Sequence, residues 1–390
     1  MLTRTIWLLS IVSLLTDVSS ELLYPVMPVY LKSIGFSFFL IGLLEGIAEA
    51  VAGLSKGYFG NLSDRMGKRL PFVQVGYALS TLSKGLLALY STLAPVFIAR
   101  VCDRLGKGVR TSARDAMLSL ETSPKTKASV FGFHRSMDTV GAAIGPLLAL
   151  IYLYYHPEDY KTLFAIAVIP GIFSVAITFI IKERKFAVEN SRKNRPGFFT
   201  YLSYWKSAGS SYKTVVAALI LFALVNSSDV FLLLAIKEKG FSDIQMIAVY
   251  IFYNLVFALI AFPIGKIADR IGLINAILTG LFVFSVVYFF FGFASTLISF
   301  AILFLAYSVF AACFEPVAKA IVSNLCAKEN TGTALGFFSS MSSIATIVAS
   351  SWTGFVWMMW GALPAFLVSA AGTMLIIAFL IFNKKKILVS

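Results

Sequence analysis

The chain alternates long apolar segments with short polar ones. Because about twenty apolar residues in a helix cross a hydrocarbon core of about 30 Å, each long segment is a candidate transmembrane helix. The pattern predicts twelve spans, at 6–31, 38–59, 70–92, 95–120, 128–155, 163–182, 213–236, 244–267, 272–292, 295–325, 333–360 and 362–383. We therefore expect an all-α membrane protein.

Composition supports this prediction. Of the 390 residues, 58% are hydrophobic and 13% are charged, whereas about 25% of a soluble domain is charged. The first apolar segment begins at Ile6 and continues past Pro28 without a cleavage pattern. It is therefore expected to be a retained helix and not a signal peptide.

Charge and rare residues exclude several functions. The net charge is +14, but the bases are scattered among apolar segments, so nucleic acid is not an expected partner. Cys102, Cys313 and Cys326 lack pairing or metal-ligand spacing. With only His134 and His156 besides, and no nucleophile–base arrangement, we expect no metal, no cofactor and no enzyme activity.

The two halves of the chain repeat each other. "GFS" at Gly35 precedes Asp64 of "DRMG", and "GFS" at Gly240 precedes Asp269 of "DRIG" by the same separation. Matches at one offset indicate duplication of a six-helix unit, the arrangement of transporters with a site near the bilayer midplane.

Further matches extend the repeat. "ASVFGFHRSM" (128–137) matches "GTALGFFSSM" (332–341) at nearly the same offset. "SSE" at Ser19 has a partner in "SSD" at Ser227, three residues out of register. We predict two six-helix bundles related by a pseudo-twofold axis.

The repeat defines three parts of the chain, which are the N-terminal bundle at 1–184, a basic and aromatic linker at 185–212, and the C-terminal bundle at 213–390. Lysine and arginine lie mostly in the linker and in the loops on its side. The positive-inside rule then places the linker and both termini in the cytoplasm. We expect a monomer in the plasma membrane.

Two loops resemble a known family. "GNLSDRMGKRL" (Gly60 to Leu70) is similar to the loop signature of the major facilitator superfamily, G-x-L-a-D-R-x-G-R-K, and "GKIADRIG" (Gly265 to Gly272) echoes it. The resemblance implies a secondary transporter with two rocking bundles, in which helices one, four, seven and ten line the cavity.

This loop has the chemistry of a conformational gate. Asp64 can lie against the positive N-terminus of another helix, and Arg65 can pair with Asp115. Contacts made in one conformation alone set which state is populated. The alternative is a turn whose solvated charges only fix topology. The expected gating residues here are Gly60, Asp64, Arg65, Gly67, Arg69, Asp115, Asp269 and Arg270.

"GAAIGP" (141–146) resembles the antiporter signature of the superfamily, G-x-x-x-G-P-x-x-G-G, with Ala149 and Leu150 in place of the closing glycines. Gly141 and Gly145 would let a neighbouring helix approach closely, and Pro146 would bend the span. We assign these residues to gating; a pure packing role is the alternative.

The fourth span contains "RVCDRLGKGVRTSARDAML" (100–118). On a helical wheel its charges fall within about 140°; they are Arg100, Asp103, Arg104, Lys107, Arg110, Arg114 and Asp115. Each cation facing lipid would cost about 2.5–3.5 kcal/mol, so the cations must meet water, substrate or acids. The available acids are Asp17, Glu21, Glu45, Glu49 and Asp138.

"RLGKGVRTSA" also resembles the fourth-helix motif of the superfamily, R-x-x-q-G-x-g-a-a. Arg104 takes the arginine place, which the resemblance links to proton coupling, while Lys107 and Arg110 replace a glutamine and a glycine. Glu21 is the first candidate proton carrier and Asp17 the second, because a changing distance to an arginine makes proton uptake and release alternate. The alternative is a permanent ion pair between spans one and four.

Spans seven and ten are mainly aromatic, so one wall of the expected cavity is charged and the other aromatic. A solute with an apolar body and a charged group suits such walls. The expected substrate-binding residues are Arg100, Lys107, Arg110, Tyr24, Asn226, Asp229, Phe231, Glu315 and Lys319.

We therefore predict a secondary active transporter that moves a small amphiphilic, potentially anionic solute by alternating access. Proton-coupled antiport, and hence efflux, is the first hypothesis, with another coupling ion left open. The alternatives are an importer or anion exchanger of an organic anion and, from another class, a non-transporting membrane receptor or sensor. The expected partners are the solute, protons and the lipid bilayer.

Overall fold

The computed structural model describes residues 2–23, 26–90, 92–183, 197–227 and 229–388, and no strand occurs within these ranges. Its helices are α1 (Arg4–Glu21), α2 (Met27–Ser33), α3 (Phe38–Met66), α4 (Leu70–Leu89), α5 (Leu93–Leu120), η1 (Pro124–Thr126), α6 (Lys127–Tyr155), α7 (Tyr160–Thr178), η3 (Thr200–Ser203), α8 (Tyr204–Ser207), α9 (Ser210–Val225), α10 (Val230–Glu238), α11 (Asp243–Ile271), α12 (Leu273–Phe291), α13 (Leu297–Asn324), η4 (Lys328–Asn330), α14 (Thr331–Trp360) and α15 (Ala362–Leu388). Among the described residues, nine helical segments are long and apolar enough to cross a membrane.

The described chain divides into two compact units. Unit 1 contains residues 1–122, 137–204 and 327–340, and unit 2 contains the intervening segments and the C-terminal part. Each unit thus includes a short segment from the opposite half of the sequence. Of the linker expected at 185–212, residues 185–196 lie outside the described part.

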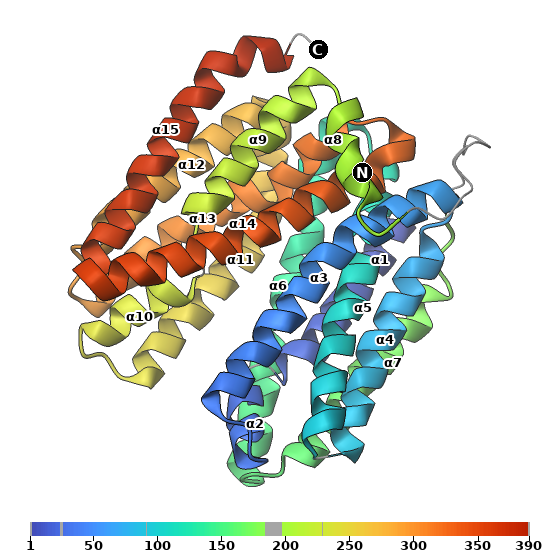
Figure 1. The fold of residues 1–390 in the computed structure, drawn as a ribbon, viewed down its shortest axis with the longest axis vertical. Helices are drawn as coiled ribbons and strands as arrows, with labels where there is room; N and C mark the ends of the chain where they lie inside the picture. Colours follow the sequence, from blue (N-terminus) through green and yellow to red (C-terminus); the bar gives the residue numbers. More distant parts are fainter. Residues whose placement is uncertain (1, 24–25, 91, 184–196, 228, 389–390) are drawn as a thin grey trace. The chain divides into compact units, whose positions relative to one another are not determined.

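In unit 1, the charged helix α5 packs against both α3 and α4, and α4 packs against α7 (Figure 1). Small residues bring α4 and α5 close together. A Cβ atom on Gly106 would lie 2.6 Å from the carbonyl oxygen of Gly76 and 2.8 Å from Ser80 Oγ. The two backbones therefore approach at a distance that excludes any larger side chain.

In unit 2, aromatic side chains fill the space between α9, α12 and α13. The rings of Phe222 and Phe284 lie 4.9 Å apart, and those of Phe284 and Tyr288 stack at 3.9 Å. Tyr307 continues the cluster toward Phe310, at 5.2 Å. Aromatic contacts of this kind add to the stability that burial gives.

Two predicted spans are interrupted instead of continuous. The first span, expected at 6–31, divides into α1 and α2, and the seventh, expected at 213–236, divides into α9 and α10. Pro28 lies at the start of α2, where its missing N–H group is tolerated. Asn226 and Asp229 flank the second break, and such short polar side chains compete with helical hydrogen bonding.

Replacing Gly106 with alanine is expected to destabilise unit 1. The added methyl group meets the backbone of α4, and overpacking of this kind costs about 1–3 kcal/mol. A Cβ at Gly85, one helix away, would meet nothing within 4 Å. The denaturation midpoint of the purified protein should fall in Gly106→Ala and not in Gly85→Ala; equal midpoints would contradict the close crossing.

Candidate functional site

The cations of α5 meet carboxylates of α3. Arg100 donates to both carboxylate oxygens of Glu45, at 2.7 and 3.0 Å, and the arginine side chain is only 8% exposed. One turn further, Arg104 pairs with Glu49 at 3.3 Å. Because a bidentate arginine–carboxylate pair is geometrically restrictive, Arg100 and Glu45 fix α5 against α3.

A second group of contacts joins α5 to α4. Lys84 donates to Asp103 at 3.2 Å and to the carbonyl oxygen of Ser80 at 3.0 Å. The guanidinium of Arg110 donates to Ser80 Oγ at 2.6 Å and lies over the ring of Tyr77. Both cations are buried. Lys84 was missed by the sequence analysis, although a base in the middle of a span is a known sign of a functional or paired group.

The last charges of α5 differ from the expectation. Arg114 donates to its neighbour Asp115 and to Ser13 Oγ of α1, at 2.9 Å. Arg65 donates to Asn61 in its own helix, at 3.1 Å. The expected Arg65–Asp115 pair is therefore replaced by local partners, because each residue has a hydrogen-bonding group one turn or less away.

Carboxylates of α1 face the same network. Asp17 interacts electrostatically with Asp138 of α6, with Lys107 and Arg110 of α5, and with Glu21. Asp17 and Glu21 are half-buried, and Glu21 is the last residue of α1, next to the helix break. The structure thus brings together the acids and bases that the sequence placed on separate spans. Tyr24, expected to bind substrate, lies outside the described residues.

Exposure separates the bases of α5 into two kinds. Arg100 and Arg110 are buried against protein groups, whereas Lys107 is exposed. Lys107 interacts electrostatically with Glu49 and Asp17. Among the three bases of α5 that were expected to bind substrate, Lys107 alone has an exposed side chain in this structure.

The glycines of α6 bring α6 against α1 at the level of the acids. A Cβ on Gly141 would lie 3.1 Å from Cβ of Asp17, and one on Gly145 would lie 2.7 Å from the backbone nitrogen of Leu22. Pro146 follows inside the continuous helix. These glycines therefore permit the approach that holds Asp138 near Asp17.

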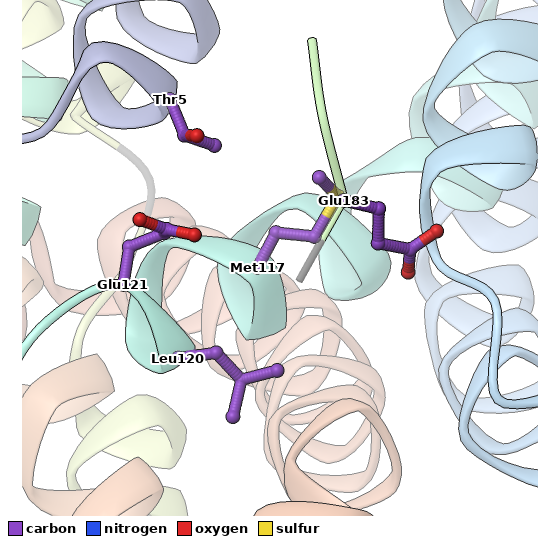
Figure 2. A pocket seen from close by; sticks show the side chains of 5 residues that line it. All are labelled: Thr5, Met117, Leu120, Glu121 and Glu183. Carbon is purple, nitrogen blue, oxygen red and sulfur yellow. The ribbon is translucent and has the colours of Figure 1, made fainter. Parts of the chain in front are cut away.

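Two small cavities can be located among the residues of unit 1 that the structure describes. One adjoins the α1–α2 break and the buried pair; its lining residues are Ser20, Leu23, Met27, Ser83, Lys84, Leu87, Arg100 and Asp103. Figure 2 shows the other, between Thr5, α5 and Glu183. There Glu183 points away from Glu121 toward the start of α4, where it accepts from the backbone nitrogens of Arg69 and Leu70 at 2.5 and 3.2 Å. Glu183 thus caps a helix.

Asp64 lies at the N-terminus of α14, the kind of position that the sequence analysis expected for its carboxylate. Its carboxylate accepts from the backbone nitrogens of Gly332 and Thr333, at 3.2 and 2.6 Å, and pairs with Arg69 at 2.7 Å. Arg69 is fully buried and also donates to the carbonyl oxygen of Lys328. The helix dipole and the buried arginine together stabilise the negative charge.

Glycines shape this contact. Gly67 ends α3 in the left-handed region, with φ of 65°, which a residue with a Cβ adopts only at a cost. A Cβ on Gly60 would collide with the carbonyl group of Gly332 and lie 3.0 Å from Cβ of Ser112. The turn and the close crossing therefore both require glycine.

Unit 2 repeats the contact. Asp269 accepts from the backbone nitrogens of Ala128 and Ser129, at 3.0 and 2.9 Å, and from the hydroxyl of Ser129. These residues begin α6, and the neighbouring Arg270 is exposed. Each unit thus uses an aspartate to hold the start of a helix whose remainder belongs to the other unit.

The polar groups of unit 2 form two pairs. Tyr307 donates to Asp229 at 2.6 Å, and Arg135 pairs with Glu315 at 2.8 Å. Arg135 was missed because it precedes the apolar part of its span, although it lies in the repeated block 128–137. Lys319 is half-buried one turn beyond Glu315.

Two further residues expected to bind substrate lie around the α9–α10 break. Asn226 follows directly after α9 as its C-cap residue. Phe231, on α10, packs against Trp357 with ring centroids 5.6 Å apart. Phe231 therefore contacts protein in this structure, on the α14 side of unit 2.

Long apolar helices with internal, paired charges are the features of a multi-pass membrane protein. The chain belongs to the Major Facilitator Superfamily, whose family model matches residues 9–272 and 216–387. Members of this superfamily are transporters and not enzymes. The resemblance in the sequence and the predicted all-α fold are thereby confirmed.

Relatives and solved structures agree. The MFS-type transporter MJ1317 of Methanocaldococcus jannaschii is 31% identical over 362 residues, 91% of this chain and 89% of the relative. The quinolone resistance protein NorA of Staphylococcus aureus is 24% identical over 186 residues, 47% of each chain. The human organic anion transporter MFSD10 (TM-score 0.81, 17% identity, 97% and 99% coverage) and the E. coli fucose:proton symporter FucP (0.76, 16%, 97% and 98%) share the fold.

Substituting Asp64 should open the contact between α3 and α14. Asp64→Asn leaves the buried Arg69 without its charge partner, and breaking a buried ion pair costs about 3–5 kcal/mol. Amide hydrogen exchange at 332–335 should rise accordingly. Asp269→Asn is the matched control: its effect at 128–131 should be smaller, and equal effects would contradict the role assigned to Arg69.

Substitutions of Arg100 and of Lys107 should affect the stability of the protein differently. Arg100→Gln leaves Glu45 without its bidentate partner, so the denaturation midpoint should fall. Lys107→Gln removes an exposed base and should leave the midpoint nearly unchanged. A larger loss of stability in Lys107→Gln than in Arg100→Gln would refute this division of roles.

Proposed function

We propose that the chain is a proton-coupled antiporter that exports a small amphiphilic solute across the plasma membrane, with both termini in the cytoplasm. The observation that carries the proposal is the group of carboxylates formed by Asp17, Glu21 and Asp138 beside the bases of α5. Carboxylates that face one another cannot all be ionised without cost. Proton uptake and release at this group therefore respond to any movement of the neighbouring bases.

The residues of the group have distinct roles in this proposal. The sequence made Glu21 the first candidate carrier, but Asp17 interacts with Asp138 of α6 and with Lys107 and Arg110 of α5. We therefore assign proton exchange to Asp17 first and to Glu21, the last residue of α1, second. Arg104, which pairs with Glu49, contributes one of the positive charges of α5 in this proposal. Arg100 and Arg110 position α5 because their guanidinium groups are occupied by protein. Of the three α5 bases that were expected to bind substrate, we therefore propose this role for Lys107 alone.

The charge balance of unit 1 bears on the solute. Six bases interact around α5, namely Lys56, Lys84, Arg100, Arg104, Lys107 and Arg110, and six acids face them, namely Asp17, Glu21, Glu45, Glu49, Asp103 and Asp138. These formal charges cancel only when every group is ionised; once Asp17, Glu21 or Asp138 takes up a proton, the bases exceed the ionised acids. We therefore propose an amphiphilic solute with an apolar body and a polar group, of which an anion is the first candidate.

Half of the chain resembles the quinolone resistance protein NorA, which makes a fluorescent quinolone a suitable first probe. In proteoliposomes with an acidic lumen, the wild type should accumulate the quinolone while a lumenal pH dye reports proton efflux. Protein-free liposomes correct for passive trapping of a weak base. Proton-driven accumulation only when the gradient is reversed would support the importer instead.

Asp17→Asn should reduce gradient-driven accumulation to the level of protein-free liposomes, because the proton carrier is lost, while counterflow exchange of the solute persists. Glu21→Gln tests the second carboxylate in the same way. Glu158→Gln, in an exposed loop, is the matched control and should behave as wild type. Full accumulation in both Asp17→Asn and Glu21→Gln would refute the assignment of the coupling group.

A further inference from the structure

The sequence repeat connects the coupling group with a residue in the other half. The motif "SSE" (19–21) ends at Glu21, the last residue of α1, and the related motif in the other half ends at Asp229, the residue before α10. Each copy therefore has an acid next to the break in its divided helix, although the two motifs are three residues out of register. Discontinuous helices in corresponding places of two repeats are where transporters bind coupling ions.

Asp229 has an unusual environment for a carboxylate. Its hydrogen bond comes from the hydroxyl of Tyr307 on α13, at 2.6 Å. The other groups that interact with it electrostatically are Glu315 of α13, Arg135 of α6, Tyr253 of α11 and Tyr288 of α12. Arg135 itself pairs with Glu315, at 2.8 Å. Among the described residues no base pairs directly with Asp229.

The polar groups at this helix break are mainly hydroxyls. The hydroxyl of Tyr288 interacts with those of Ser227 and Tyr307, and the rings of Tyr288 and Tyr307 lie 6.4 Å apart between centroids. Asn226 Oδ1, just after α9, has no hydrogen-bond partner among the described residues, and buried acceptors without donors are rare in native structures. The break therefore holds hydroxyl groups that bond to one another and an amide oxygen that can still accept a hydrogen bond.

From this arrangement we infer that Asp229 is a second proton-binding carboxyl group, so that each of the two units binds one proton in the transport cycle. The inference rests on the proposed proton-coupled function and deepens it. A charged carboxylate inside a membrane is costly unless paired or opened to water. Asp229, which has a single tyrosine donor and aromatic neighbours, therefore takes up a proton when closed off and releases it when hydrated.

The step balances with one proton. In uptake, a proton from water forms an O–H bond with the carboxylate oxygen of Asp229 that does not accept from Tyr307. In release, the same O–H bond breaks and the proton returns to water. Tyr307 keeps its own proton and positions the carboxyl group through its hydrogen bond.

Infrared difference spectroscopy of the full-length protein in detergent tests this without a substrate. As pH is stepped, a neutral carboxyl group gives a C=O stretching band that disappears on ionisation. Asp229→Asn should lose one band that the wild type has, and Asp17→Asn should lose a different one. Glu158→Gln, outside the membrane helices, should keep both.

Tyr307→Phe provides a second measurement that does not remove the carboxyl group. Loss of the phenolic donor should move the Asp229 band to higher wavenumber. The inference is overturned if Asp229→Asn retains every band or if Tyr307→Phe shifts none. If the Asp229 band is present and Asp17→Asn loses nothing, the proposed N-terminal carrier fails while the second site stands.

Discussion

The fold depends on one constraint, which is that charges inside a membrane must be satisfied by other groups of the protein or by water. Helix α5 carries several such charges, and their partners lie on two neighbouring helices. Glu45 and Glu49 of α3 hold Arg100 and Arg104, while Lys84 of α4 holds Asp103. Because these pairs connect α5 with both neighbours, unit 1 packs around its charges as much as around its apolar surface.

The two units share a duplicated architecture but differ in the side chains that surround the divided helix. Each has a divided helix, at α1–α2 and α9–α10, and each uses an aspartate to hold the start of a helix. Unit 1 surrounds its divided helix with opposed charges, and unit 2 surrounds its own with aromatic rings. This difference accords with the coupling role proposed for one unit and with the proton site inferred for the other, where tyrosines are the main neighbours.

The aspartate contacts give the duplication a mechanical consequence. Asp64 and Asp269 bind backbone N–H groups that are free only at a helix start. The bond to Asp64 is reinforced by the buried Arg69, whereas Asp269 uses backbone and serine groups. The two contacts are therefore expected to open at different free energies, which would make one of them the stronger restraint on the cycle.

The sequence determined the class of fold, the duplication, and the motif residues Asp64 and Asp269, because apolar length, repeated spacing and glycine requirements are local properties of the chain. It also showed that the charges of α5 share one face. The partners of those charges depended on tertiary packing. Only the structure showed that Arg114 pairs with Asp115, Lys84 with Asp103, and Arg135 with Glu315. It also showed that the first and seventh spans are each divided into two helices. A choice among partners is made by three-dimensional distance, which helical periodicity does not encode.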